Sequence, residues 1–235
     1  MQRLKLFSVL CLAALNFQGC ASYTEETRDI RQLYRGDQFQ TALEKLDAST
    51  IKNEDKNRLL YRLEKAMILD RMGDFKKSRN LLIEADKIAD ELYTVSISRT
   101  AASFVMNDGA MDYSGEDYEK VAIHTQLALS FIGTNELESA RVQAKKINNK
   151  LHEINQQYEK NKNRYSEDAF ARFLSGLIFE ARGELDDAII DYGRALELYS
   201  SEYARFVVGG VPAALVSSYA QVLSKTWAHR QVGGP

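Results

Sequence analysis

One short pattern recurs four times along the 235 residues and restricts the fold more than any other feature. Each copy has a glycine or asparagine turn, then an acidic or polar residue, an apolar residue and, three residues further on, a small residue. The copies begin at Gly36, Gly73, Asn135 and Gly183. Glycine permits the positive φ angle at which one helix ends, and an acidic residue favours the positive start of the next helix. The sequence therefore predicts four helical hairpins.

Small residues at matching positions allow the two helices of a hairpin to approach closely. They are Ala42, Ser78, Ala140 and Ala188. The fourth copy resembles the tetratricopeptide repeat (TPR), with Gly176, Ala188, Tyr192 and Ala195 at its small, small, aromatic and small positions. The first copy has one extra residue in its turn. The resemblance implies an all-α fold: a TPR-like α-solenoid of irregular helical hairpins with two insertions and a C-terminal capping helix.

Composition supports helices and disfavours one class of partner. The chain has only 2 prolines, which are rare where backbone N–H groups are committed to helices. The formal net charge is −2, with Lys and Arg scattered among Asp and Glu. A general nucleic-acid binder would normally present a basic surface, so no nucleic-acid partner is expected.

The first twenty residues have the pattern of a targeting segment. Arg3 and Lys5 precede the apolar run 6–15, which is too short to span a bilayer but suits a signal peptide. Residues 17–20 (Phe-Gln-Gly-Cys) resemble the lipobox of bacterial lipoproteins, in which the cysteine is lipidated and becomes the first mature residue. The resemblance implies lipidation at Cys20, and Ala21 after it points to the outer membrane. The alternative is an ordinary secretory signal that leaves a soluble periplasmic protein.

These features divide the chain into four expected parts. Residues 1–19 are a cleaved lipoprotein signal peptide and 20–26 a tether. Residues 27–200 form the TPR-like domain, and 201–235 a capping segment with a frayed end. In that last segment Gly209 and Gly210 break the chain before an apolar helix over 213–227.

The small residues of the four copies are unevenly spaced, which indicates two insertions. After the third turn, an apolar stripe predicts one long helix over 136–161. The stripe is Ala140, Ala144, Ile147, Leu151, Ile154 and Tyr158. This helix either packs on its neighbour as an elongated second helix or protrudes to pair with a partner. The other insertion, 93–120, contains a predicted short helix over 94–106.

A distinctive loop follows that short helix. It contains Asn107, Asp108, Tyr113, Gly115, Glu116 and Asp117, followed by Tyr118 and Glu119. Ser114 and Asp117 resemble a capping box for the next helix. The string resembles one found in a family of bacterial TPR-bearing envelope lipoproteins with no settled biochemical activity. A calcium loop is disfavoured, because with Gly115 at the glycine position Val121 falls on the last ligand.

The expected partner is a protein or peptide of the cell envelope, and nothing in the sequence sets the oligomeric state. In stacked hairpins, the first helices line a groove in which such a segment can lie. The candidate groove residues are Leu63, Met67, Asp70, Arg71, Thr125, Leu129, Ile132, Phe173, Leu177 and Glu180.

The function that follows is a membrane-anchored, non-catalytic scaffold. One alternative is a structural subunit of an outer-membrane, pilus or secretion assembly, docking through the long helix. A less favoured one is a cell-wall or glycan-processing enzyme, which needs converging carboxylates.

No catalytic or metal-binding motif stands out. His152 and Glu153 begin like a zinc-protease motif, but Gln156 stands where the second histidine is required. His124 is expected to be a core histidine. We therefore expect no catalytic residue, no metal and no cofactor.

Overall fold

The computed structural model describes residues 23–100, 112–157, 167–201 and 209–232. Within these ranges the chain forms helices and turns and contains no strand, as predicted. None of the helices in this part of the chain is long and apolar enough to cross a membrane. The groups of residues that pack together form two compact units, and the boundary between them falls inside α5, after Ser78.

The first unit contains the first hairpin and the helix that follows it. Helix α2 (Tyr23–Arg35) packs on α3 (Phe39–Asp47), and α3 packs on α4 (Arg58–Arg71). Two short 3-10 turns, Thr50–Lys52 and Asp55–Asn57, join α3 to α4. The buried core of this unit is Ile30, Ala42, Leu46 and Ile68. Helix α2 begins at Tyr23, before the expected end of the tether.

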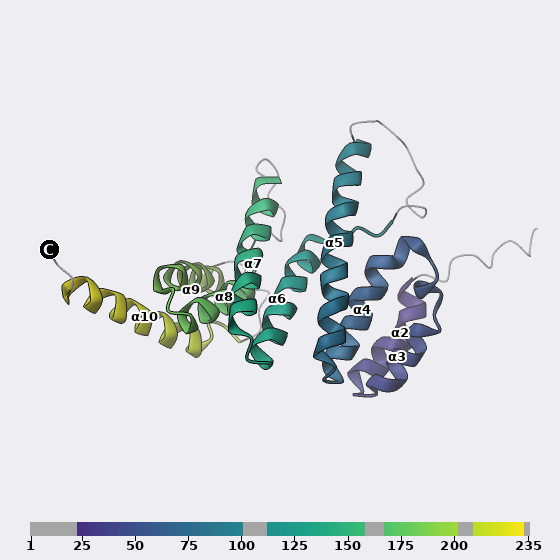
Figure 1. The fold of residues 1–235 in the computed structure, drawn as a ribbon, viewed down its shortest axis with the longest axis horizontal. Coiled ribbons are helices and arrows are strands. Elements are labelled where there is room, and N and C mark those ends of the chain that lie inside the picture. The colour runs from purple at the N-terminus through teal and green to yellow at the C-terminus, as the bar shows by residue number, and fades with distance from the viewer. Residues whose placement is uncertain (1–22, 101–111, 158–166, 202–208, 233–235) are drawn as a thin grey trace, which may run out of the picture. The chain divides into compact units, whose positions relative to one another are not determined.

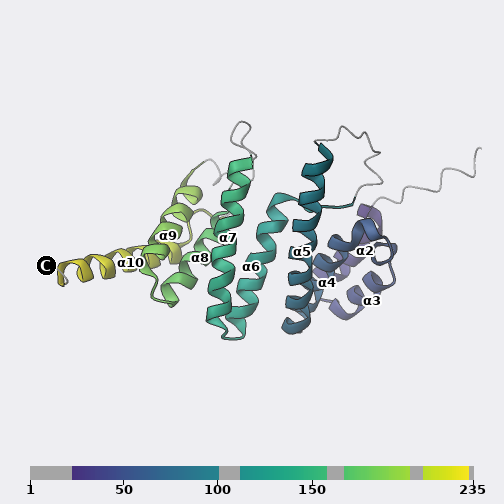
Figure 2. The same cartoon turned by 45° about the horizontal axis from the view of Figure 1, so that its top comes forward.

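The second unit contains the two later hairpins and a last helix. Its helices are the rest of α5 (Phe75–Thr100), α6 (Asp117–Gly133), α7 (Leu137–Gln157), α8 (Ala169–Ala181), α9 (Leu185–Ser200) and α10 (Ala213–Val232). Each of α7 to α10 packs on the helix before it in the chain, and α6 contacts α5 through His124 and Asp86 (Figures 1 and 2). The largest core cluster takes in buried residues of α6 to α10, most of them from α8 and α9, and includes Phe173, Phe179 and Tyr192.

All four hairpin turns share one backbone geometry. The left-handed residues are Asp37, Asn135, Gly73 and Gly183, with φ of 56°, 60°, 80° and 75°. In every turn the next residue donates its N–H to a carbonyl five positions earlier, as Glu184 does to Phe179 at 2.9 Å. The second helix then starts at Phe39, Phe75, Leu137 or Leu185. The hairpins therefore close in the same way despite different sequences.

This geometry corrects the predicted register of the first hairpin. The sequence assigned the turn to Gly36 and gave that copy an extra residue, but Asp37 adopts the left-handed conformation. Asp and Asn tolerate that region better than most residues because their short side chains bond locally. With Asp37 in this place, Ala42 lies at the same distance from the turn as Ser78, Ala140 and Ala188. No residue is extra.

Helix lengths differ from prediction in the first insertion. The sequence predicted a separate helix from Thr94, but α5 continues without a break from Phe75 to Thr100. No glycine or proline lies between Tyr93 and Thr100 to end it. The remainder of that predicted helix, 101–106, lies outside the described residues.

The long helix of the second insertion is an internal packing element. The apolar stripe of α7 is buried from Ala140 to Ile154, and its later part packs with Val121 of α6 and Ala171 of α8. The interpretation as an elongated second helix is therefore right, and that of a stripe free to pair with a partner is wrong. Tyr158 and the end of the predicted helix lie outside the described residues.

Candidate protein-binding surface

Close contact between the helices of a hairpin is set by the small residues. A Cβ atom at Gly176 would lie 2.5 Å from Cδ1 of Tyr192, so only glycine allows α8 to approach α9 this closely. In the first unit, the hydroxyl of Ser78 donates to the carbonyl of Ala66 at 2.9 Å. These contacts fix which side of each first helix faces its own hairpin partner.

A neighbouring side of the first helices carries exposed apolar residues at recurring positions. Leu129 of α6 and Leu177 of α8 each directly follow the small residue of their helix, and each is 37% exposed. Ile132 is 41% exposed on the same side of α6. In the first unit, Met67 has the corresponding place on α4 and is also exposed. Each of these four exposed residues is among the candidate groove residues named from the sequence.

The other candidate groove residues have local structural contacts. Leu63, Asp70 and Thr125 are half-buried, and Phe173 is buried. Arg71 is exposed but lies 3.3 Å from Asp37 and above the ring of Phe39. The carboxylate of Glu180 accepts a hydrogen bond from the hydroxyl of Tyr192 at 2.7 Å. It also lies 3.4 Å from the amine of Lys225. The exposed apolar members are therefore better candidates than the polar ones.

Two further exposed aromatic residues of these helices are not among the candidates named from the sequence. Phe170 lies one stripe position before Phe173 on α8 and is 47% exposed, and Tyr118 at the start of α6 is 52% exposed. Both continue the helical spacing of the predicted residues toward the amino end, so extending the pattern by one turn in α8 and by two turns in α6 would have found them. We call Leu129, Ile132, Phe170 and Leu177 the first-helix surface.

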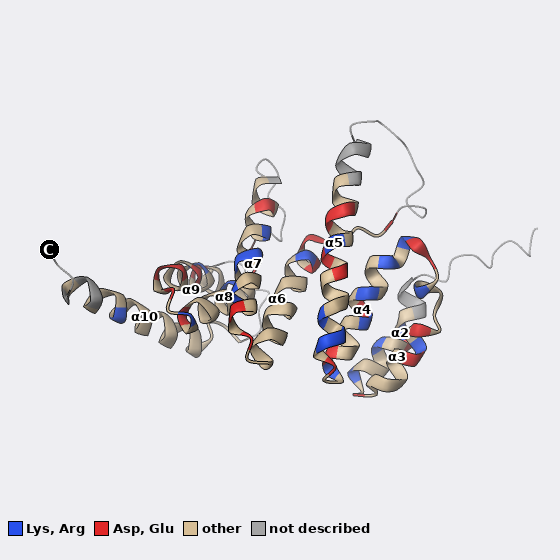
Figure 3. Cartoon of the chain, in the orientation of Figure 1, with Lys and Arg blue, Asp and Glu red and all other residues tan. Residues whose placement is uncertain are grey.

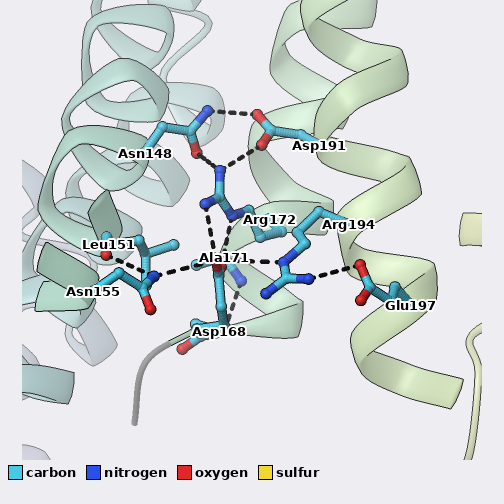
Figure 4. A network of polar contacts seen from close by, with 10 residues as sticks. Asn148, Leu151, Asn155, Asp168, Ala171, Arg172, Asp191, Arg194 and Glu197 are labelled. Atoms are coloured by element: carbon cyan, nitrogen blue, oxygen red, sulfur yellow. Dashed lines mark hydrogen bonds and ion pairs between the residues drawn. The ribbon is translucent and has the colours of Figure 1, made fainter. Parts of the chain in front are cut away.

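A buried polar network supports α8 beneath this surface (Figure 4). Arg172 of α8 donates to Asn148 of α7 and to Asp191 of α9, both at 3.0 Å. Its Nε also lies 3.0 Å from Glu167, which Arg194 approaches from α9. Burial raises the pKa of Asp191, and its bonds to Asn148 and Arg172 counter this. The network joins three consecutive helices and fixes the orientation of α8.

A second polar contact supports α6. His124 is 2% exposed, with Nε2 3.2 Å from Asp86 of α5 and Nδ1 3.1 Å from Gln143 of α7. Burial acts to raise the pKa of Asp86, but His124 and Lys146 outweigh it and hold that pKa at about 2. His124 is the satisfied core histidine that the sequence suggested.

The distinctive loop is described only in part. Asn107 and Asp108 lie outside the described residues. The N–H of Tyr113 donates to the carbonyl of Lys56 within the first unit. In the second unit, Gly115 has φ of 78°, and Glu116 and Glu119 form the capping box of α6. The predicted box of Ser114 and Asp117 is wrong, because the turn at Gly115 places the helix start two residues later.

Carboxylates converge in one small cavity of the second unit. Its volume is about 100 Å³, and Asp90, Asp117 and Glu153 line it with two lysines. Lys150 lies 2.9 Å from Glu153 and 3.3 Å from Asp90, while Lys120 lies 3.5 Å from Asp117. The pair of Lys150 with Asp90 joins α7 to α5, whereas the pair of Lys120 with Asp117 lies within α6. Among the described residues, no group of three or more His, Cys, Asp or Glu side chains could hold a metal ion.

The comparisons with known proteins identify the fold class. No protein-family model matches the sequence, and no curated protein sequence matches it. RapI in its apo form is similar in structure, with a TM-score of 0.58 at 16% identity over 93% of this chain. The chain spans 54% of the length of RapI. A kinesin-light-chain-type protein from Podosopora anserina with TPR-like repeats has a TM-score of 0.53 at 13% identity, over 88% of each chain.

These likenesses confirm the predicted TPR-like helical repeat fold. At such low identity they show the fold alone. The fold is compatible with a scaffold for protein–protein interaction, since stacked hairpins present a continuous surface on their first helices.

Proposed function

We propose that this chain is a non-catalytic TPR-like scaffold that binds an apolar segment of a protein partner on its first-helix surface. The observation that carries the proposal is the exposure of Leu129, Ile132 and Leu177 at recurring positions of α6 and α8. Exposed apolar side chains at such spacing match a partner helix that presents residues at i, i+3, i+4 and i+7. The networks around Arg172 and His124 hold these two helices in place before a partner binds.

Rigid support of the surface is what a binding function requires. A preformed surface does not lose side-chain and backbone freedom on association, so more of the contact energy contributes to affinity. The apolar residues would supply the centre of such an interface. The surrounding polar residues, such as Thr125 and Glu180, would form its rim.

Site-specific photo-crosslinking in the host tests the proposal. A photoreactive residue at Leu129 or Leu177 should yield the same crosslinked protein. The matched control is Ile190, which is 65% exposed on α9, and the same residue there should not yield that adduct. With the captured partner purified, Leu177→Glu should weaken binding at least about tenfold and Ile190→Glu should not. Equal crosslinking from all three positions, or unchanged affinity of Leu177→Glu, would contradict the proposal.

The proposed location is the bacterial cell envelope, with a lipid on Cys20 holding the scaffold at the outer membrane. Support comes from the sequence of residues 1–20, which lie outside the described residues. Cys20→Ser should move the protein from the membrane fraction to the soluble fraction. Cys11→Ser, which alters the other cysteine, should leave it in the membrane fraction. Continued membrane attachment of Cys20→Ser would refute the anchor without affecting the binding proposal.

A further inference from the structure

Helix α10 occupies the place of the first helix of a further hairpin. Among the helices before it in the chain, it packs mainly on α9 and less on α8. In the same way, among the helices before α8, that helix packs mainly on α7 and less on α6. Leu215 and Val222 are both 0% exposed on the side that faces α9. In register they correspond to Ala171 and Ile178, the buried residues of α8. The ring of Tyr219 contacts that of Tyr192, with centroids 6.4 Å apart.

The face that a second helix would cover is open on α10. On α8 this face contains Arg172, Gly176 and Phe179, and α9 covers it. In the same register, α10 has Val216, Ala220 and Leu223, followed one turn later by Trp227. Val216, Leu223 and Trp227 are 49%, 42% and 68% exposed. A contiguous exposed apolar face of this kind usually marks an interaction site, so it indicates an occupant.

We propose that the occupant is a second copy of this chain, and that two α10 helices pair antiparallel about a two-fold axis at Ala220. A two-fold interface uses the same patch on both subunits and must therefore be complementary to itself. The open face meets this condition. All of its members are exposed, and they are Ala213, Val216, Ser217, Ala220, Leu223, Ser224 and Trp227.

The order of sizes along this face carries the proposal. Antiparallel pairing about Ala220 places Trp227 opposite Ala213 of the partner. It also places Leu223 opposite Ser217 and Val216 opposite Ser224. Every large side chain then faces a small one, so the two surfaces can interdigitate. A parallel pair would place Trp227 against Trp227 and Ala213 against Ala213, which leaves one end crowded and the other open.

The polar groups of the face are compatible with burial. Ser217 donates its hydroxyl to the carbonyl of Ala213 at 3.0 Å, and Ser224 donates to that of Gln221 at 2.8 Å. Both hydroxyl protons are therefore satisfied within the helix before any partner arrives.

Charge also favours a second copy over a charged partner. Helix α10 contains no Asp or Glu, and Figure 3 shows its described part as mostly uncharged. Its Lys225 is directed to Glu180 of α8, 3.4 Å away. The open face itself has no charge that would repel an identical face or select an oppositely charged one. One helix pair is small beside the roughly 800 Å² per partner of a standard interface, so we expect micromolar dissociation.

The single tryptophan gives a direct test. The full chain is kept under reducing conditions, so that Cys11 and Cys20 form no disulfide, and is diluted from about 100 μM to about 0.1 μM, a range that spans micromolar affinity. The emission of Trp227 should move to longer wavelength as its ring becomes exposed. The mass measured by analytical ultracentrifugation should halve over the same range. A monomer at every concentration would overturn the proposal.

Matched variants locate the interface. Leu223→Glu should be monomeric and show the long-wavelength emission throughout. Ile190→Glu, which places the same charge at an exposed residue of α9, should dimerise like the parent chain. Circular dichroism should give both variants the helix content of the parent. Equal loss of the dimer in both variants would place the interface elsewhere and refute the assignment to α10.

Disulfide trapping tests the orientation in a Cys11→Ser, Cys20→Ser background. Ala220→Cys should form a crosslinked dimer on mild oxidation, because the two positions meet at the axis. A mixture of Ala213→Cys and Trp227→Cys chains should form the mixed dimer in preference to either self-dimer. Ala214→Cys, exposed on another side of the helix, is the control and should remain uncrosslinked. Efficient self-crosslinking of Ala213→Cys would show a parallel pair and contradict the antiparallel arrangement.

Discussion

Helices α8 and α10 have the same place in successive hairpins but differ in what covers them. Gly176 and Phe179 of α8 lie under α9, and Gly176 is in contact with the buried ring of Tyr192. The corresponding face of α10 has Ala220 and Leu223 and is exposed. One stripe of small and apolar residues therefore serves as a hairpin contact in one helix and as a free surface in the next. Whether such a stripe is a core or an interface depends on whether another helix packs on it.

The same contrast appears four positions before the small residue of each first helix. That small residue is Ala128 on α6, Gly176 on α8 and Ala220 on α10. On α6 and α8 the residue four positions earlier is polar and paired with an acid of a neighbouring helix, as His124 is with the half-buried Asp86 and Arg172 with the buried Asp191. On α10 it is Val216, which is apolar and exposed. Under a covering helix, a polar side chain finds fixed partners and orients its neighbours. On an open face an apolar residue is available for a partner.

The largest expected effect comes from the aromatic residue that α9 packs against α8. Tyr192→Ala should lower the free energy of unfolding by about 3–5 kcal/mol, because it leaves a cavity against Gly176 and Phe173. Trp227→Ala should change it by less than about 1 kcal/mol when measured at a dilution where the chain is monomeric. Urea unfolding followed by circular dichroism measures both. A comparable loss in the two variants would mean that α10 is as fully covered as α8.

The hairpins were predictable from sequence because their information is local. Turn, apolar residue and small residue lie within a few positions, so Gly73, Asn135 and Gly183 marked the ends of α4, α6 and α8 correctly. The exception is the first turn, where the sequence pointed to Gly36 although Asp37 adopts the positive φ. Both residues tolerate that conformation, and local sequence alone does not choose between them.

The support of the candidate surface was not predictable in this way. Arg172 and Asp191 lie on different helices, and no sequence pattern singles out either one, because a charged residue on a helix usually belongs to a solvated face. Their burial depends on how α7, α8 and α9 pack together, which no local pattern encodes. The open face of α10 has the same origin. Its sequence predicted an apolar capping helix correctly, but only the packing on α9 shows which side is left uncovered.

A somewhat smaller effect is expected from breaking the polar pair that orients α8. Arg172→Met should destabilise the chain by about 3 kcal/mol, because it leaves Asp191 as a buried charge without its main partner. Arg172→Met combined with Asp191→Leu should recover most of that loss, while Glu167 keeps its contact with Arg194. Val216→Ser, at the corresponding place on α10, should change stability by less than about 0.5 kcal/mol. A double variant no more stable than Arg172→Met would show that the network acts through other contacts.

The smallest effect concerns the pair at the same position of α6 and depends on pH. The pKa of Asp86 is lowered to about 2 in the folded chain, below the roughly 3.9 of an unfolded aspartate. A lowered carboxyl pKa stabilises the fold at pH values above the unfolded pKa. That contribution is lost as the pH falls through the folded pKa. Asp86→Asn should therefore cost roughly 1–2 kcal/mol at pH 7, and the difference from the parent should shrink between about pH 4 and pH 2.

Urea unfolding of the parent and of Asp86→Asn across this range measures the effect. The control is Asp90→Asn on the same helix, because the Asp90 side chain is 64% exposed and its pair with Lys150 should contribute little. A difference for Asp86→Asn that is constant from pH 7 to about pH 2 would mean that its charge does not stabilise α6. In that case His124 and Arg172 would act in the covered helices through their shape rather than through charge. They would then differ from Val216 of α10 only in how they pack.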